Sequence, residues 1–349
     1  MVTKIGFDLG YANITLSDVT AGIYREPSVA LVDKNTRKIV AVGNNAISGD
    51  FGDSDSLMLV RPFKNGLLFD REITYGVIEN AVRAVLPSEK IRCIIGTPAD
   101  FLPKQEKELF SMMSDAGITE CYAVNRAVAA LVGAGYSPSI SAISVNIGAS
   151  GTDIVVLYGG KVIHSSRASV GGEDFDKAVK QHIFEQGDVN ISLSVARAIK
   201  EKLAAVAVGM ENESLDIEGT LSLTGSRVKM NITTEDIAGV FEKTLCDLFG
   251  AVADAIKQIP IACVEEIFAN GIILTGGGAL VYGLDRLMSK ILGVSVKMPS
   301  DALDSVAKGL SRINAFLPIR MRSNNKNITA QIAKYYETKK TENNGGYTK

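Results

Sequence analysis

The chain has 349 residues, of which 46% are hydrophobic and 22% charged, and its formal net charge is −2. This composition is that of a folded globular protein and excludes a disordered or collagen-like chain. The length exceeds the roughly 250 to 300 residues at which a single core stops growing, so two lobes are expected. No basic field covers the surface, and nucleic acid is not an expected partner.

Cysteine, histidine and apolar patterns exclude several kinds of site. The four cysteines show no CxxC spacing and no signal segment opens the chain, which predicts a cytoplasmic protein with reduced thiols. The longest apolar runs are far shorter than the roughly 20 residues of a membrane-spanning helix. With only His164 and His182, neither a histidine metal site nor a Ser-His-Asp triad is expected. The GxxxxGK[ST] motif of Walker-type NTPases is also missing.

Three apolar, β-branched runs each lead into a glycine-rich turn, within residues 4–10, 142–151 and 272–279. Each run predicts a buried strand followed by a tight turn. After the first two turns the chain returns in a second apolar strand, so each forms a strand, glycine hairpin and strand. Two such similar units indicate an internal duplication.

Helical periodicity fills the intervals between these units. Residues 74–85, for example, place Val77, Ile78, Ala81 and Val82 on one face. The other predicted helices are 103–116, 174–184, 193–208, 234–259 and 280–292, and residues 216–232 alternate as a hairpin. Strands that alternate with helices in two duplicated halves predict a two-domain α/β protein with mixed sheets.

The glycine turns suggest phosphate binding, because backbone without Cβ atoms lets successive N–H groups converge on an anion. Two hairpins that face one another would clamp a polyphosphate. Asp8 opens the first and would hold water or Mg²⁺ against the phosphates, and Asn146 has the equivalent place in the second. Residues 276–278, which precede a helix, would approach the sugar and base or the α-phosphate.

These residues carry a family resemblance. Residues 8–13, 170–176 and 274–279, with several shorter stretches between 26 and 98, resemble the motifs of MreB-group bacterial actins, over roughly residues 4–315. The resemblance implies a duplicated actin-like (ribonuclease H-like) α/β fold, with two domains around a nucleotide cleft. The expected boundaries are 1–140 for domain I, 141–319 for domain II and 320–349 for a flexible basic tail.

The resemblance also implies cofactors and a set of site residues. ATP and Mg²⁺ are expected, with Asp8 toward the metal and no catalytic residue assigned. The expected nucleotide contacts are Asp8, Gly10, Tyr11, Ala12, Asn13, Asn146, Gly148, Ala149, Ser150, Gly151, Thr152, Gly171, Gly172, Arg197, Lys200, Gly276, Gly277, Gly278 and Ala279.

Four positions depart from the family pattern. Tyr11 replaces a small hydroxyl residue, Asn146 an Asp, Arg126 the Glu that positions the attacking water, and Arg197 a Glu that binds the ribose. Arginine does not polarise water as a carboxylate does, so slow or absent hydrolysis is expected. Arg126 and Arg197 have two interpretations: their guanidiniums contact phosphate and compensate for lost metal binding, or the cleft has decayed and they are solvated.

The resemblance implies a filament-forming cytoskeletal protein that contributes to rod cell shape, with itself, MreB paralogues and cell-wall synthesis or membrane proteins as partners. An alternative is a nucleotide-independent or non-hydrolysing paralogue that regulates a catalytic MreB. A sugar-kinase-like enzyme is disfavoured, since the segment around Asn125 and Arg126 offers no carboxylate base.

The C-terminal tail, residues 320–349, has seven Lys or Arg against two Glu. Its net charge of +5 leaves −7 for the rest of the chain. Ile328, Ile332, Tyr335 and Tyr336 recur with helical spacing beside lysines, which predicts weak contact with an anionic membrane surface. The protein would then lie at the inner face of the cell membrane. The alternative is a solvated, disordered tail.

Overall fold

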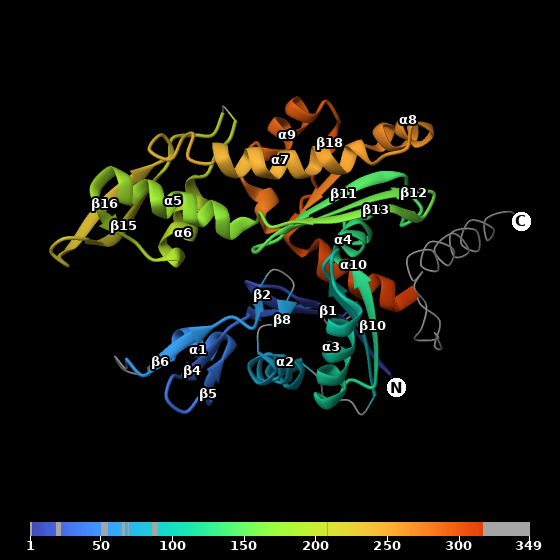
Figure 1. The fold of residues 1–349 in the computed structure, drawn as a ribbon, viewed down its shortest axis with the longest axis horizontal. Helices are drawn as coiled ribbons and strands as arrows, with labels where there is room; N and C mark the ends of the chain where they lie inside the picture. The colour runs from blue at the N-terminus through green and yellow to red at the C-terminus, as the bar shows by residue number, and fades with distance from the viewer. Residues whose placement is uncertain are drawn as a thin grey trace, which may run out of the picture.

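The computed structural model describes residues 2–18, 22–49, 55–64, 67–68, 70–85, 90–207 and 209–316. Two mixed sheets, one per lobe, dominate this part of the chain, and each has five strands there (Figure 1). The first has the order β10 (Glu120–Asn125), β9 (Ile91–Thr97), β1 (Thr3–Leu9), β2 (Asn13–Asp18), β3 (Gly22–Pro27). The second has the order β13 (Lys161–Ala168), β12 (Thr152–Tyr158), β11 (Ala142–Ile147), β17 (Ile272–Thr275), β18 (Val296–Lys297).

The two sheets repeat one arrangement, as the predicted duplication requires. β1 pairs antiparallel with β2 and parallel with β9, whereas β11 pairs antiparallel with β12 and parallel with β17. A glycine hairpin therefore joins the first two strands of each unit at the same end of its sheet. The strands β9, β11 and β17 are buried along their whole length, which explains their nearly continuous apolar sequences.

Smaller sheets extend each lobe on the same side of the molecule (left in Figure 1). In the first lobe this sheet joins β5 (Ile39–Val42), β4 (Ala30–Asp33) and β6 (Leu57–Val60), near α1 (Gly43–Ser48) and the short pair β7 (Phe63–Lys64) and β8 (Leu67–Leu68). In the second lobe it joins β14 (Val189–Asn190), β15 (Ser214–Leu221) and β16 (Arg227–Thr233).

Helices cover the sheets and complete the cores. The first lobe has α2 (Arg71–Val85) and α3 (Pro103–Asp115). The second has α5 (Gly172–Gly187), α6 (Leu193–Leu203), α7 (Glu242–Lys257), α8 (Ile261–Asn270), the short η1 (Gly277–Leu280) and η2 (Ala302–Asp304), and α9 (Leu284–Leu292). In the second core the rings of Phe175 and Phe241 pack with their centroids 5.3 Å apart.

Two helices lie between the two large sheets, α4 (Arg126–Gly133) and α10 (Ser305–Phe316) (Figure 1). Their backbones touch at two glycines. A Cβ atom on Gly133 would lie 1.7 Å from the Ser305 carbonyl oxygen, and one on Gly309 would lie 1.7 Å from that of Ala129. Only glycine allows this approach.

Helix α10 returns to the first sheet after the chain has passed through the second lobe. Its Asn314 amide donates to the Ile5 and Arg92 carbonyls at 2.8 and 2.9 Å, and Ser17 donates to the Ala307 carbonyl at 2.5 Å. The proposed boundaries at residues 140 and 319 stay predictions. The tail 320–349 lies outside the described residues.

Some predicted elements begin or end elsewhere, for local reasons. Helix α2 starts at Arg71, three residues early, because the Asp70 carboxylate accepts from the N–H groups of Glu72 and Ile73 at 2.9 and 3.1 Å. The helix predicted over 234–259 begins only at Glu242, since Gly239 with φ of 79° interrupts it.

Two further predicted helices are shorter than expected. The one predicted over 193–208 ends at Leu203, where the chain turns to pair with Tyr282: the Val206 N–H donates to the Tyr282 carbonyl at 2.9 Å. In the segment predicted as a helix over 280–292, Gly283 with φ of 78° separates η1 from α9.

Candidate functional site

A cavity of about 670 Å³ lies between the glycine turns of the two lobes. Most of the predicted site residues line it: Asp8, Gly10, Tyr11, Ala12, Asn13, Asn146, Gly148, Ala149, Gly172, Arg197, Lys200, Gly276, Gly277 and Gly278. Ser150, Gly151, Thr152, Gly171 and Ala279 are not part of its lining. A cavity of this size suits a small ligand or a nucleotide.

The first hairpin is closed by a bond from the Gly10 N–H to the Asn13 carbonyl at 3.0 Å. Arg61, which directly follows β6, supports this hairpin. Its guanidinium donates to the carbonyls of Tyr11 and Ala12 at 3.1 and 3.2 Å. The guanidinium carbon also lies 5.2 Å from the centroid of the Tyr11 ring, over which it stacks. Burial, and interaction with the Glu173 carboxylate, raise the pKa of Tyr11 to about 12. Because Glu173 belongs to α5, Tyr11 links the two lobes.

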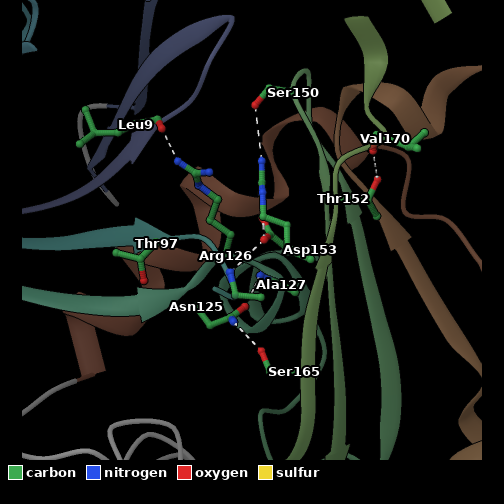
Figure 2. Close-up of polar contacts among 12 residues, drawn as sticks. Leu9, Thr97, Asn125, Arg126, Ala127, Ser150, Thr152, Asp153, Ser165 and Val170 are labelled. Atoms are coloured by element: carbon green, nitrogen blue, oxygen red, sulfur yellow. Dashed lines mark hydrogen bonds and ion pairs between the residues drawn. The ribbon is translucent and has the colours of Figure 1, made fainter. Parts of the chain in front are cut away.

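The packing of the second hairpin explains why Gly151, Thr152 and Gly171 do not line the cavity. The Gly148 N–H donates to the Gly151 carbonyl at 2.9 Å, and a Cβ atom on Gly171 would lie 2.3 Å from the Gly151 nitrogen. Thr152 donates to the Val170 carbonyl at 2.7 Å (Figure 2). Gly151, Thr152 and Gly171 therefore fix the hairpin against the start of α5.

The third turn packs directly on the second hairpin. Gly276 has φ of 88°, and its Cβ atom would lie 2.3 Å from the Ile147 carbonyl oxygen. Thr275 donates to the Asn146 side-chain oxygen at 3.3 Å, and the Ala279 side chain is fully buried. This contact holds Gly276, Gly277 and Gly278 at the cavity wall, while Ala279 serves the core.

Arg126 forms an ion pair with Asp8, 118 residues away in sequence. Its Nε atom lies 3.0 Å from Asp8 Oδ1. Its Nη2 group donates to the Leu9 carbonyl, as Figure 2 shows. Only 13% of the Arg126 side chain and 21% of the Asp8 side chain are exposed. Burial raises the pKa of Asp8, although Arg126 opposes this shift. The solvated alternative is therefore wrong for Arg126.

Arg197 and Lys200 share a different carboxylate. Asp176 on α5 is fully buried, with Arg197 Nε at 3.2 Å and Lys200 Nζ at 2.6 Å. Lys200 also donates to the Gly172 carbonyl at 3.1 Å. About a third of the Arg197 side chain is exposed at the cavity, so Arg197 is anchored rather than freely solvated. The two cations exceed the one carboxylate by one positive charge.

Sequence reasoning missed a third ion pair, behind the second hairpin. Arg167 Nη1 lies 3.0 Å from Asp153 Oδ1, and both side chains are buried. The Ala99 N–H of the first lobe donates to the same oxygen at 2.9 Å, which joins the lobes. Asp153 and Arg167 are directly opposite in the β12–β13 register, and that cross-strand pairing is the signal that would have revealed them.

A second, water-sized cavity of about 20 Å³ adjoins Arg126, Tyr11 and Ser150. Among its described lining residues no Asp or Glu is present; the others are Leu9, Phe63, Gly96, Thr97, Pro98, Phe101 and Leu109. A water held here would contact no carboxylate of this wall, and the wall therefore offers no general base.

The expected metal is not well matched by the residues present. Mg²⁺ requires oxygen ligands, usually one or two carboxylates together with substrate phosphates. Asp8 already has a guanidinium partner, and the neutral Asn146 accepts a bond from Thr275. Among the residues that the structure describes, no cluster of three or more His, Cys, Asp or Glu side chains could hold a metal ion.

Comparison with solved structures identifies the class of fold. The chain superposes on MreB 5 of Spiroplasma citri bound to AMPPNP with a TM-score of 0.82, at 22% identity over 88% of this chain and 95% of that one. It superposes on the MamK double helical filament with a TM-score of 0.78, at 20% identity over 91% of this chain and 100% of that one. The chain therefore has the two-domain actin-like fold.

Sequence comparison then gives the family. The family model described as MreB/Mbl protein matches residues 2–318, and the chain belongs to this family. The cell shape-determining protein Mbl of Bacillus cereus is 30% identical over 312 residues, which cover 87% of this chain and 93% of that protein. MreB of Escherichia coli is 26% identical over 316 residues, which cover 87% of this chain and 91% of that protein.

None of the helices within the described residues combines the length and apolar character needed to cross a membrane. The tail at 320–349, which carries the predicted membrane contact, is outside those residues.

Proposed function

We propose that this chain is an MreB-type actin-like cytoskeletal protein that binds ATP between its lobes, assembles into filaments and contributes to cell shape. The observation that carries the proposal is the cavity of about 670 Å³ bounded by three glycine turns, with Arg197 and Lys200 on its wall. Backbone N–H groups and cations in one cavity suit a polyphosphate. The residues that line it are the proposed nucleotide contacts.

The relatives support the nucleotide and the filament. Spiroplasma citri MreB 5 was crystallised with AMPPNP and with ADP, and MamK forms a double helical filament. The proteins similar in sequence are named as cell shape-determining. We carry these properties to this chain as parts of the proposal, together with self-association as its first partner interaction.

Hydrolysis is proposed to be slow or absent. The water-sized cavity beside Arg126 has no carboxylate on its described wall, and Arg126 is paired with Asp8. Removing a group that activates or positions the attacking water lowers rates by about a hundredfold or more. Turnover comparable to that of ordinary MreB proteins in a phosphate-release assay would contradict this part of the proposal.

The same observation favours a second candidate function, a non-hydrolysing paralogue that co-assembles with a catalytic MreB and regulates it. Filaments that form equally with and without nucleotide, and that incorporate into filaments of a catalytic MreB, would favour it. Filaments that require ATP would favour the first candidate.

Calorimetric titration of the full chain with ATP, followed by electron microscopy with ATP, with ADP and without nucleotide, tests the proposal. We expect saturable binding and filaments. A chain that shows neither would contradict both candidates. Pelleting with liposomes of anionic lipid, for the full chain and for one that ends at residue 319, tests the proposed contact of the tail with the membrane.

A further inference from the structure

Two of the three acidic residues in the described lining of the nucleotide cavity are already paired with cations of the chain itself. Asp8, Asp176 and Glu201 are the acidic residues among its described lining. Asp8 pairs with Arg126 and Asp176 with both Arg197 and Lys200. Glu201 is exposed on α6, between Lys200 and Lys202 in sequence. A divalent cation entering this cavity therefore meets carboxylates whose charge is largely neutralised.

We infer that the chain binds its nucleotide without a divalent cation, and that Arg126 supplies the positive charge beside the first hairpin. This inference rests on the proposed function, since it concerns the same cleft. Arg126 is the first residue of α4, where the helix dipole also favours a nearby anion. Guanidinium and helix terminus thus act together.

The position of Arg126 is built into the fold. Gly96 of β9 lies opposite Asp8 in the sheet register, and a Cβ atom there would lie 3.2 Å from Arg126 Cγ and 3.5 Å from Asp8 Oδ1. The absence of a side chain at Gly96 therefore leaves room for the ion pair. Asn125 caps α4 by accepting from the Ala127 N–H at 2.8 Å, which fixes the helix start.

Arg126 keeps donors for a ligand while it holds Asp8. A guanidinium has five N–H groups. The contacts with Asp8 and Leu9 use Nε and one N–H of Nη2. Arg126 lines the water-sized cavity beside Tyr11 and Ser150 of the two hairpins rather than the large cavity, so its remaining donors would serve a phosphate oxygen that reaches this smaller cavity. A hydrated Mg²⁺ at Asp8 would instead be repelled by the guanidinium, and Asn146 would offer it only a neutral oxygen.

Titration of the full chain with ATP in excess Mg²⁺ and in excess EDTA tests the inference. We expect the two dissociation constants to agree within about threefold. Binding that weakens about tenfold or more in EDTA would overturn the inference and leave the proposed function intact. Absence of binding in both conditions would overturn both.

Two substitutions are expected to change the affinity for ATP in opposite directions. In Arg126→Gln, Asp8 loses its partner, and we expect weaker binding in EDTA that Mg²⁺ restores by about tenfold. In Asp8→Asn the guanidinium is released toward phosphate, so affinity should stay equal or tighten in both conditions. The role of Arg126 would be overturned if Asp8→Asn bound ATP more weakly in Mg²⁺ while Arg126→Gln kept the dissociation constants of the unaltered chain in both Mg²⁺ and EDTA.

Arg83→Gln is the matched control, since Arg83 makes an exposed ion pair with Glu79 at 2.8 Å within α2, away from the cavity lining. Its dissociation constants should equal those of the unaltered chain. Far-ultraviolet circular dichroism and thermal melting establish that each variant is folded. If Arg126→Gln does not fold, the direction in which Asp8→Asn changes the affinity for ATP decides the inference.

Discussion

The two glycine hairpins of the cleft share a backbone but differ in where they place charge. The first presents Asp8 at the cavity and neutralises it with Arg126 from α4. The second presents the neutral Asn146 at the cavity and has its acid, Asp153, behind the hairpin against Arg167. Duplication has thus preserved the N–H geometry that suits phosphate in both halves, while neither of the two described hairpins offers an unpaired carboxylate to a metal.

Arg167→Leu should have the largest effect on stability, because it leaves Asp153 buried with no cation. The Arg167 and Asp153 side chains are 6% and 2% exposed. Breaking such a pair costs about 3–5 kcal/mol. The free energy of unfolding in urea measures the loss. Arg126→Leu should cost clearly less, because Asp8 retains 21% exposure. Equal losses in the free energy of unfolding for Arg167→Leu and Arg126→Leu would contradict the proposed difference in burial between the two ion pairs.

Replacing Arg126 by Glu and Asn146 by Asp in one chain should bring hydrolysis closer to that of the family. The family pattern carries a carboxylate at both positions, and a positioned base contributes about a hundredfold to such a rate. We expect phosphate release in Mg²⁺ to rise at least about tenfold. Unchanged turnover in a double variant that still binds ATP would show that these two substitutions do not limit hydrolysis.

Asp8→Asn should change how stability depends on pH. Burial raises the pKa of Asp8, so the folded chain holds this proton to higher pH than the unfolded chain. The linked stability is full below the ordinary aspartate pKa of about 3.9 and is lost as pH rises through the raised pKa. Urea unfolding at a series of pH values should show this decline in the unaltered chain and not in Asp8→Asn. If the free energy of unfolding depended on pH in the same way in both chains, the pH dependence could not be assigned to Asp8.

Tyr11→Phe should have the smallest effect. It removes the hydroxyl that interacts with Glu173 across the lobes, and even a full hydrogen bond there would contribute only about 0.5–1.5 kcal/mol. The corresponding place in the second hairpin holds Ala149, so the link exists on one side only. Unfolding in urea measures the loss, and Tyr75→Phe on α2, whose hydroxyl bonds Glu79 at 3.0 Å, is the matched control. A larger loss in the control would argue against a bridge between the lobes.

Local sequence was sufficient for the elements with strong periodicity and for the glycine turns. Helix α3, for example, begins at Pro103 as predicted, because proline suits the first turn of a helix. The turns at Gly10, Gly148 and Gly276 were recognised because close backbone approach requires glycine. The sequence pattern did not predict helix ends that depend on one residue in an unusual backbone conformation, such as Gly239 with its positive φ.

The charge pattern of the cleft was not predictable from sequence alone. The partner of Arg126 depends on β1 and β9 lying side by side, on the empty space at Gly96 and on the direction in which α4 leaves β10. Each of these is a tertiary property. The sequence shows the departures at Arg126 and Asn146 from the family pattern, but only the distances show that Arg126 pairs with Asp8 and that Asn146 accepts from Thr275.

The paired glycines of α4 and α10 limit the ways in which the lobes move against each other. With Gly133 against the Ser305 carbonyl and Gly309 against that of Ala129, sliding either helix along its axis would drive larger side chains into backbone. The crossing therefore resists shear of one helix along the other.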